Sequence, residues 1–249
     1  MTVSLFDVQT GFGGGKPGVR EEVNAEDWLA EMARLSIDRA LVRTLPAELD
    51  SDIPVSNEML FRTCSTHKEL VPCPVLVPGV GRDFPPAPEQ VAAVIEKGGV
   101  AGCLRPKEDY WLAAEWASGD LFRALSDRSL PAYCVESEFG LESIAELAGN
   151  HSELPFILAE TGYRSQRTLL SLLQTFGNIY LSIGNRYTVS GGIAQIVEIV
   201  GAQQLLFGTG FPDSDPMPAI TMLMYAEISN EEKVLIGSQN MERLIEGVK

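Results

Sequence analysis

Two glutamates stand where acid or base chemistry could use them. Glu136 and Glu160 each end a short apolar run of the chain. If these runs are neighbouring parallel strands, the two carboxylates meet at one edge, and their repulsion raises one pKa toward a general acid/base role. The favoured alternative is that each carboxylate pairs with a nearby cation. Three arginines could supply it: Arg105, Arg164 and Arg186.

Polar side chains at other predicted strand ends could hold a ligand. Gln9 and Arg105 are the candidates for orienting a substrate, because guanidinium and amide groups bind small polar or carboxylated molecules directionally. Five hydroxyl or amide side chains could donate hydrogen bonds to a ligand or equally cap their own loops: Thr161, Tyr163, Ser182, Asn185 and Thr209.

The sequence indicates no nucleophile. Cys103 and Cys134 fall in predicted strands, with Cys134 near a strand end, but no histidine is close enough in sequence to activate either thiol. The four cysteines form no CxxC pair and are interpreted as buried thiols of a cytosolic protein. The two histidines, His67 and His151, are predicted to lie on the surface.

Composition narrows the class of partner. The 249 residues carry 19 Lys and Arg against 34 Asp and Glu, a formal net charge of −15, and 45% of them are hydrophobic. Such an acidic surface repels phosphate backbones and anionic lipid, so we expect no nucleic-acid or membrane partner. No apolar stretch is long enough to span a bilayer, and no secretory leader is visible, so a cytoplasmic location is expected. A homo-oligomer is compatible with this composition.

Short apolar runs alternate with segments of helical period along the chain. Near-continuous apolar strands joined by helical crossovers are typical of a parallel sheet covered by helices. The predicted strands are 3–8, 39–43, 70–77, 100–105, 130–136, 155–160, 179–183 and 205–209. The predicted helices are 25–37, 57–67, 89–97, 112–116, 121–126, 141–148, 165–176, 193–200, 218–226 and 231–246.

Eight such units in this length predict a single (β/α)₈ barrel, an α/β fold, spanning residues 1–249 as one domain. In these barrels the site is built at the carboxyl ends of the strands. A small-molecule ligand is therefore expected at that face. The positions to inspect are Asp7, Gln9, Arg43, Pro78, Arg105, Glu136, Glu160, Ser182, Asn185 and 209–213.

Two stretches resemble the amidohydrolase-related family of metal-dependent barrel hydrolases. Residues 206–212 (LFGTGFP) are similar to the F-G-[ST]-D-x-P motif of its eighth strand, and 236–245 (IGSQNMERLI) to the closing helix I-x-x-x-N-x-x-R-L. Residues 6–11 (FDVQTG) lie where the family has D-x-H-x-H after a hydrophobic residue. The resemblance covers the chain in outline and implies the same barrel and hydrolytic chemistry.

The departures concern the metal that the resemblance implies. The family holds a divalent ion through two histidines on strand one, one each after strands five and six, and an aspartate after strand eight. At the corresponding positions this sequence has Gln9, Gly11, Val135 or Glu136 (depending on the alignment), Glu160 and Gly210. None of these residues is a histidine, and the two glycines have no side chain that could bind zinc. Oxygen ligation of a hard ion by Gln9, Glu136 and Glu160 is a remote alternative. A site without metal or other cofactor is expected.

Two functions follow from the resemblance and its departures. The first is a hydrolase or lyase acting on a small polar molecule through a degenerate, metal-free site, with Glu136 and Glu160 as the catalytic acid and base. The second is a catalytically inactive relative, a pseudoenzyme that binds a ligand or partner in the old site. The substrate itself is not encoded in any pattern of the sequence.

Overall fold

The computed structural model describes residues 3–14, 22–45, 52–184, 186–187 and 189–249. Eight parallel strands and their helices alternate along the chain, as the sequence predicts. The strands are β1 (Phe6–Gly13), β2 (Arg39–Leu45), β3 (Leu70–Pro72), β4 (Gly102–Leu104), β5 (Ala132–Val135), β6 (Phe156–Ala159), β7 (Ile179–Ile183) and β8 (Leu205–Phe207).

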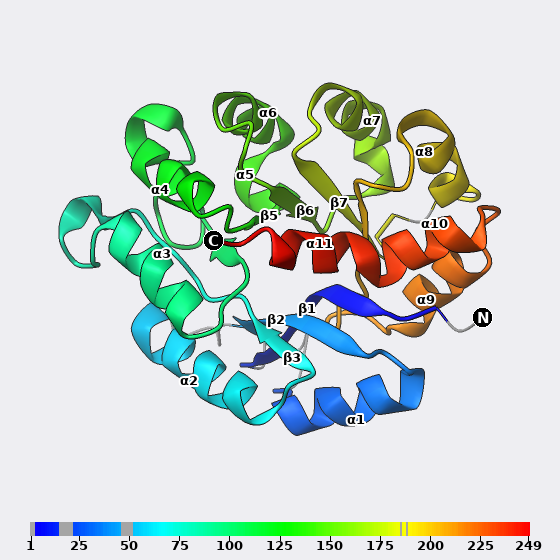
Figure 1. Cartoon of the computed structure of the whole chain (residues 1–249), viewed down its shortest axis with the longest axis horizontal. Helices are drawn as coiled ribbons and strands as arrows, with labels where there is room; N and C mark the ends of the chain where they lie inside the picture. Colours follow the sequence, from blue (N-terminus) through cyan, green and yellow to red (C-terminus); the bar gives the residue numbers. More distant parts are fainter. Residues whose placement is uncertain (1–2, 15–21, 46–51, 185, 188) are drawn as a thin grey trace.

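The helices surround the strands as an outer layer (Figure 1). The α-helices are α1 (Ala25–Leu35), α2 (Ile53–Thr66), α3 (Ala87–Glu96), α4 (Glu115–Asp127), α5 (Glu136–Phe139), α6 (Leu141–Asn150), α7 (Gln166–Thr175), α8 (Gly192–Val200), α9 (Met217–Met224), α10 (Asn230–Val234) and α11 (Asn240–Glu246). Two short 3₁₀ turns and one π-helical segment complete the elements: η1 (Gly79–Gly81), η2 (Tyr163–Ser165) and η3 (Leu235–Gln239).

Backbone hydrogen bonds close the strands into a barrel. The order β1-β2-β3 forms one continuous ladder and β4-β5-β6-β7-β8 the other. The Cys103 amide donates to the Pro74 carbonyl oxygen at 2.8 Å across the β3/β4 seam, and the Gly210 amide donates to the Gln9 carbonyl oxygen at 2.9 Å between β8 and β1. Both seams are therefore joined, and the predicted (β/α)₈ barrel is confirmed.

Side chains alternate between the two faces of each strand. One apolar layer therefore fills the barrel, and a second lies between the strands and the helices. Val8, Leu41 and Tyr133 point into the barrel, whereas Trp28 of α1 and Cys134 belong to the layer between strands and helices. Cys134 thus faces the helices and not the barrel interior, although its strand ends near the site. All four cysteines are buried and unpaired, which confirms their prediction as buried thiols.

Helix α11 covers the amino-terminal end of the barrel (Figure 1). Its Met241 and Leu244 pack with Phe6 in the interior cluster, and Glu242 pairs with Arg39 at 2.7 Å. The buried Asn240 donates through Nδ2 to the Ala202 and Leu205 carbonyl oxygens, each at 2.7 Å. This contact explains why the closing helix carries an asparagine, and it leaves the opposite end of the barrel for a site.

Several predicted elements differ at their ends from the observed ones. Residues 112–114 precede α4, so the two predicted helices of this region are one. The predicted last helix, 231–246, is interrupted by η3, where a Cβ at Gly237 would lie 2.7 Å from the Ser4 carbonyl oxygen. Where the helix approaches the chain before β1 this closely, its turn is the wider π-helical turn of η3. Glu136 opens α5 and does not end β5.

His151 corrects a prediction. It follows α6 at the amino-terminal side of β6, as expected, but it is buried and not a surface residue. Its Nε2 lies 2.8 Å from Glu115 Oε2, and its ring packs against Phe122 with centroids 5.8 Å apart. Packing and one carboxylate therefore account for this histidine, far from the strand ends where a ligand is expected.

Candidate functional site at the carboxyl ends of the strands

Arg43 is the main charged group inside the carboxyl end of the barrel. It lies on β2 in the same alternation as the interior residue Leu41, and its side chain is 13% exposed. The guanidinium carbon stands 4.4 Å from the centroid of the Tyr133 ring. Its carboxylate partner is Glu160, with Nη2 3.6 Å from Oε1. A guanidinium is always charged, so this is a buried cation with a loose ion pair.

Arg43 Nε and two other buried polar atoms at this end of the barrel have no protein partner among the described residues. Among the described residues, Arg43 Nε, the Tyr133 hydroxyl and Thr161 Oγ1 accept or donate no hydrogen bond. Tyr133 and Thr161 are at most 2% exposed. A buried polar group without a partner costs about 1–3 kcal/mol, so each of these atoms calls for an explanation such as a bound ligand or water.

The two predicted catalytic glutamates meet different partners. Glu160 lies directly after β6 with a positive φ of 58°, and it contacts two guanidinium groups, Arg43 at 3.6 Å and Arg186 at 3.5 Å. Glu136 accepts a hydrogen bond from the Ser165 hydroxyl and one of 3.4 Å from the Gly162 amide. Pairing with cations therefore describes Glu160, while Glu136 fastens the loop that follows β6.

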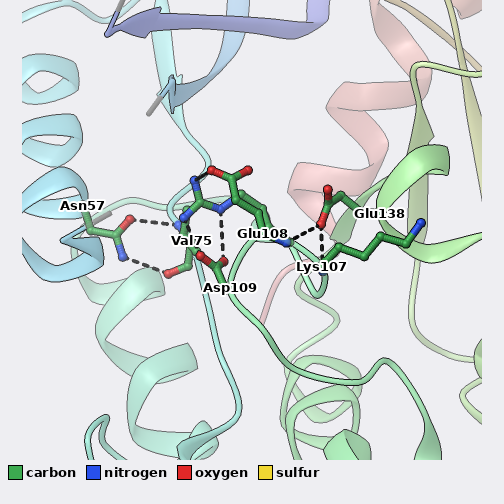
Figure 2. Close-up of polar contacts among 7 residues, drawn as sticks. Asn57, Val75, Lys107, Glu108, Asp109 and Glu138 are labelled. Atoms are coloured by element: carbon green, nitrogen blue, oxygen red, sulfur yellow. Dashed lines mark hydrogen bonds and ion pairs between the residues drawn. The ribbon is translucent and has the colours of Figure 1, made fainter. Parts of the chain in front are cut away.

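Arg105 is neutralised by the loop that follows its own strand. Its Nε and Nη2 donate to Asp109 at 3.1 and 2.8 Å, and Nη1 donates to Glu108 at 3.2 Å. Figure 2 shows this loop held from the other side by Glu138, whose Oε2 accepts from the amides of Lys107 and Glu108 at 2.9 and 3.0 Å. The Arg105 side chain is 11% exposed, so its charge mainly organises the loop.

Gln9 and Thr209 belong to the junction of β1 and β8, and Asp7 joins them. Asp7 Oδ1 accepts from the amides of Gln9 and Thr209, each at 2.9 Å, and Oδ2 accepts from the Thr209 hydroxyl. Burial raises the pKa of Asp7 to about 6, against the lowering effect of those donors. Gln9 Oε1 accepts from the Ser182 hydroxyl at 3.1 Å. The Thr209 side chain is fully buried, so it fastens the barrel at this point.

The remaining predicted ligand residues lie outside this cluster. Tyr163 is in η2 and is 50% exposed, with the Arg164 guanidinium 5.9 Å from its ring centroid. Asn185 lies outside the described residues. Arg43 and Tyr133 were not among the predicted ligand residues. Arg43 was a strand-end position, and a charged residue in the interior phase of an apolar strand was the signal that could have selected it.

A separate cavity of about 730 Å³ is lined by residues that follow β3 and β4, and Arg43 and Tyr133 are not among them. Its wall combines apolar and aromatic side chains, Val77, Phe84 and Trp111 among them, with the carboxylates Glu108 and Asp109. Val77 belongs to the same interior cluster as Tyr133, and Phe84 and Trp111 pack against that cluster. A volume of this size accommodates a small molecule.

The donor set does not fit the divalent metal that the family resemblance implies. A Cβ at Gly11 would lie 2.8 Å from the Arg43 carbonyl oxygen, so no ligand side chain could stand at that position. Gly210 has a φ of 79° and offers only its backbone. Among the described residues, no three His, Cys, Asp or Glu side chains are grouped to hold an ion. A catalytic zinc site needs about three such ligands.

Solved structures of the same fold include enzymes that act on aromatic acids. A 2,6-dihydroxybenzoate decarboxylase from Rhizobium is 12% identical with a TM-score of 0.77, covering 98% of this chain and 99% of that chain. A 5-carboxyvanillate decarboxylase from Sphingomonas paucimobilis is 13% identical with a TM-score of 0.76 over 100% of both chains. At these identities the likeness establishes the fold alone.

A third similar structure was solved with a metal. It is a dihydroxybenzoic acid decarboxylase from Polaromonas with bound manganese and the inhibitor 2-nitroresorcinol, 12% identical with a TM-score of 0.75, covering 98% of this chain and 97% of that chain.

No curated protein sequence matches the chain. Within the described residues, no helix is both long and apolar enough to cross a membrane. The sequence profile of the amidohydrolase family matches residues 21–245, and the chain therefore belongs to that family.

Proposed function

We propose that this protein binds a small carboxylate at the carboxyl end of its barrel and acts on it as a hydrolase or lyase. One observation carries the proposal: the Arg43 guanidinium is buried, its Nε has no hydrogen-bond partner in the described structure, and the Glu160 carboxylate lies 3.6 Å from Nη2. A ligand carboxylate would supply the close, charge-assisted hydrogen bond that Nε lacks and that the 3.6 Å ion pair does not provide. The three decarboxylases of similar fold support a carboxylate substrate and the lyase alternative.

Glu160 is the acid/base candidate that stands next to this anchor. A ligand bound to Arg43 would displace part of the ion pair and bring its reacting atoms near the Glu160 carboxylate. From there Glu160 could deliver a proton to the substrate or accept one from water. Gln9 is proposed to orient the substrate directly, and Arg105 to orient it through the loop that its guanidinium organises. Glu136 is proposed to act while it is bound to Ser165 of the loop after β6.

The proposed chemistry uses no family metal. The positions that correspond to the metal ligands hold Gln9, Gly11 and Gly210, and a cation already occupies the same end of the barrel in Arg43. Positive charge for a developing anion would come from the guanidinium. This is electrostatic stabilisation by a preorganised group, one of the largest contributions available to an enzyme.

A ligand-binding pseudoenzyme is the second candidate, and the engagement of both glutamates favours it. Glu136 is held by Ser165 and Gly162, and Glu160 lies between two guanidinium groups. Carboxylates engaged in this way serve structure or ligand recognition as readily as proton transfer. In this case Arg43 would still anchor a small carboxylate, but no bond in it would change.

Ligand-binding measurements test the role of Arg43 as the anchor. Calorimetric titration with 2,6-dihydroxybenzoate should give saturable binding in wild-type protein treated with a chelator, and Mn²⁺ should leave the affinity unchanged. Arg43→Met should lose that binding, while the exposed Arg62→Met should retain it. A wild-type affinity that appears only with Mn²⁺, or an unaltered affinity in Arg43→Met, would contradict the proposal.

Turnover separates the enzyme from the pseudoenzyme. Product formation from a panel of aromatic and aliphatic carboxylates, followed by chromatography, should be abolished by Glu160→Gln with the fold intact by circular dichroism. Glu198→Gln, on the exposed side of α8, is the matched control and should keep the wild-type rate. Binding without turnover across the panel would favour the pseudoenzyme, and an unchanged rate in Glu160→Gln would remove that residue from the mechanism.

A further inference from the structure

The cavity of about 730 Å³ that follows β3 and β4 combines two kinds of side chain in its wall. Four aromatic rings belong to it: Phe84, Tyr110, Trp111 and Trp116. Three carboxylates share the wall with them: Asp83, Glu108 and Asp109. No lysine or arginine stands among the described residues that line it. The wall therefore offers apolar surface and negative charge to the same occupant.

The four rings differ in what holds them. Phe84 and Trp111 pack against the interior cluster, and Trp111 also meets the Phe139 ring edge-on, with centroids 6.4 Å apart. Tyr110 and Trp116 are instead 96% and 83% exposed. Tyr110 holds its ring in water from a backbone φ of 54°, a left-handed conformation that is uncommon and costly outside glycine. Packing accounts for the two inner rings but not for the two exposed ones.

The carboxylates of this wall are only partly neutralised. Glu108 and Asp109 share one guanidinium, that of Arg105, at 3.2 and 2.8 Å (Figure 2). Burial raises the pKa of Glu108, and the carboxylates Asp109 and Glu138 reinforce that rise against the effect of the guanidinium. Asp83 is exposed and has no hydrogen bond or ion pair with another described residue. One guanidinium therefore leaves negative charge in excess at the wall.

We propose that this cavity is a second binding site, which takes a small organic ammonium ion with an apolar body. An ammonium group is attracted by the faces of aromatic rings and by carboxylates at the same time. A neutral apolar molecule would gain nothing from the carboxylates, and an anion would be repelled by them. The volume lies in the range of small-molecule sites. The site is independent of the proposed carboxylate anchor, because Arg43 does not line it.

Three probes of one shape and different charge test the preference for a cation. Tryptophan fluorescence is the readout, because two of the three tryptophans, Trp111 and Trp116, line the cavity. At about pH 7 and low salt, 2-phenylethylammonium should bind saturably and about fivefold more tightly than neutral 2-phenylethanol, with phenylacetate the weakest. No saturable binding of the ammonium ion, equal affinity for the alcohol, or tighter binding of phenylacetate would overturn the proposal.

Single substitutions test the two halves of the wall. Glu108→Gln keeps an oxygen for Arg105 and removes one charge, so the ammonium affinity should fall about fivefold while that of the alcohol is unchanged. Trp116→Leu should lower the ammonium affinity by about two- to fivefold, with Trp111 as the remaining reporter. Tyr225→Leu, on an 84% exposed ring outside the cavity, is the matched control and should bind like the wild type. Unchanged ammonium affinity in either cavity variant would overturn the proposal.

Arg43→Met separates this site from the proposed carboxylate anchor. The variant should bind 2-phenylethylammonium with wild-type affinity, and the comparison with phenylacetate is made in it so that the anchor does not contribute. Loss of ammonium binding in Arg43→Met would place the cation inside the barrel and overturn the second site. Ammonium binding that persists when no carboxylate binds the wild type would leave the second site standing although the proposed function fails.

Discussion

Two arginines near the same end of the barrel lie in opposite electrostatic settings. Arg105 donates to Asp109 and Glu108 through hydrogen bonds of 2.8–3.2 Å. Arg43 instead stacks on Tyr133, with its nearest carboxylate at 3.6 Å and its Nε unbonded within the described structure. Both side chains are mostly buried, at 11% and 13% exposed.

The carboxylates near these two arginines also differ in how they are paired. Asp109 is bound by a guanidinium, whereas the direct donors to Asp7 are the neutral amides of Gln9 and Thr209 and the Thr209 hydroxyl. Charges that hold a fold together are paired, because a buried charge without a partner is costly. Asp7 is held by neutral donors at the junction of β1 and β8, whereas Arg43 keeps incomplete pairing, which is what a binding site needs and a structural network avoids.

The largest expected effect is the pH dependence that Asp7 imparts to stability. Its pKa is raised from the ordinary 3.8 to about 6 in the fold, so the folded state holds this proton more tightly than the unfolded chain. The stabilisation is complete below about pH 4 and is lost as the pH rises through 6, a change of about 3 kcal/mol.

Asp7→Asn tests that effect, because the amide oxygen can still accept from the two backbone amides. Relative to the wild type, the variant should gain stability between about pH 4 and 7 in urea unfolding. The difference between the two proteins is the quantity to follow, because the paired carboxylates titrate in both. Parallel curves for the two proteins over this range would show that the Asp7 carboxyl does not carry the raised pKa.

The next effect separates the two arginines by function. Arg43→Met should lower the affinity for 2,6-dihydroxybenzoate by about 100-fold, because charge-assisted hydrogen bonds to a buried anion contribute about 1.5–3 kcal/mol. Its free energy of unfolding should change little, since methionine keeps the packing on Tyr133 and removes a loosely paired cation. A large loss of stability with retained affinity would reverse the comparison and make Arg43 the structural arginine.

Arg105→Met should behave in the opposite way. Removing this guanidinium leaves Asp109 buried without its partner, and we expect a loss of about 2 kcal/mol in the free energy of unfolding. Carboxylate affinity should stay within a few-fold of the wild type. Asp109→Asn, which keeps a hydrogen-bond acceptor for Arg105, is the matched control and should be less destabilising. Loss of affinity without loss of stability would return Arg105 to the role of ligand anchor.

Much of the fold could be predicted because apolar strands alternate with amphipathic helices throughout the chain. The eight strands follow from that alternation. The ends of the elements are set by contacts that no local pattern reports, such as the close approach of Gly237 to Ser4. His151 likewise took a buried place because α4 supplies Glu115 and Phe122, which are distant in sequence.

The candidate site could be predicted as a set of strand-end positions but not as a set of pairs. Arg43, Arg105 and Glu160 all occupy such positions. The pairing of Arg105 depends on the loop after β4, where the Asp109 amide donates to the Arg105 carbonyl oxygen at 2.8 Å and turns the carboxylate back onto the guanidinium. That turn has no sequence signature comparable to a strand, so the sequence does not predict that Asp109 binds Arg105 while Arg43 keeps an unpartnered Nε.

Tyr133→Phe is the smallest and most selective change. It keeps the aromatic face under Arg43 and removes a buried hydroxyl that has no partner in the described structure. Because removing such a group relieves its desolvation cost, the free energy of unfolding should stay constant or rise by up to about 1 kcal/mol. Affinity for 2,6-dihydroxybenzoate should fall a few-fold if the proposed anion on Arg43 takes the unpartnered hydroxyl of the ring under it as a donor. Tyr110→Phe, on a 96% exposed ring, should change neither quantity.

A Tyr133→Phe variant that is destabilised would mean that its hydroxyl has a structural partner. The incomplete pairing that distinguishes Arg43 from Arg105 would then belong to the fold and not to a ligand.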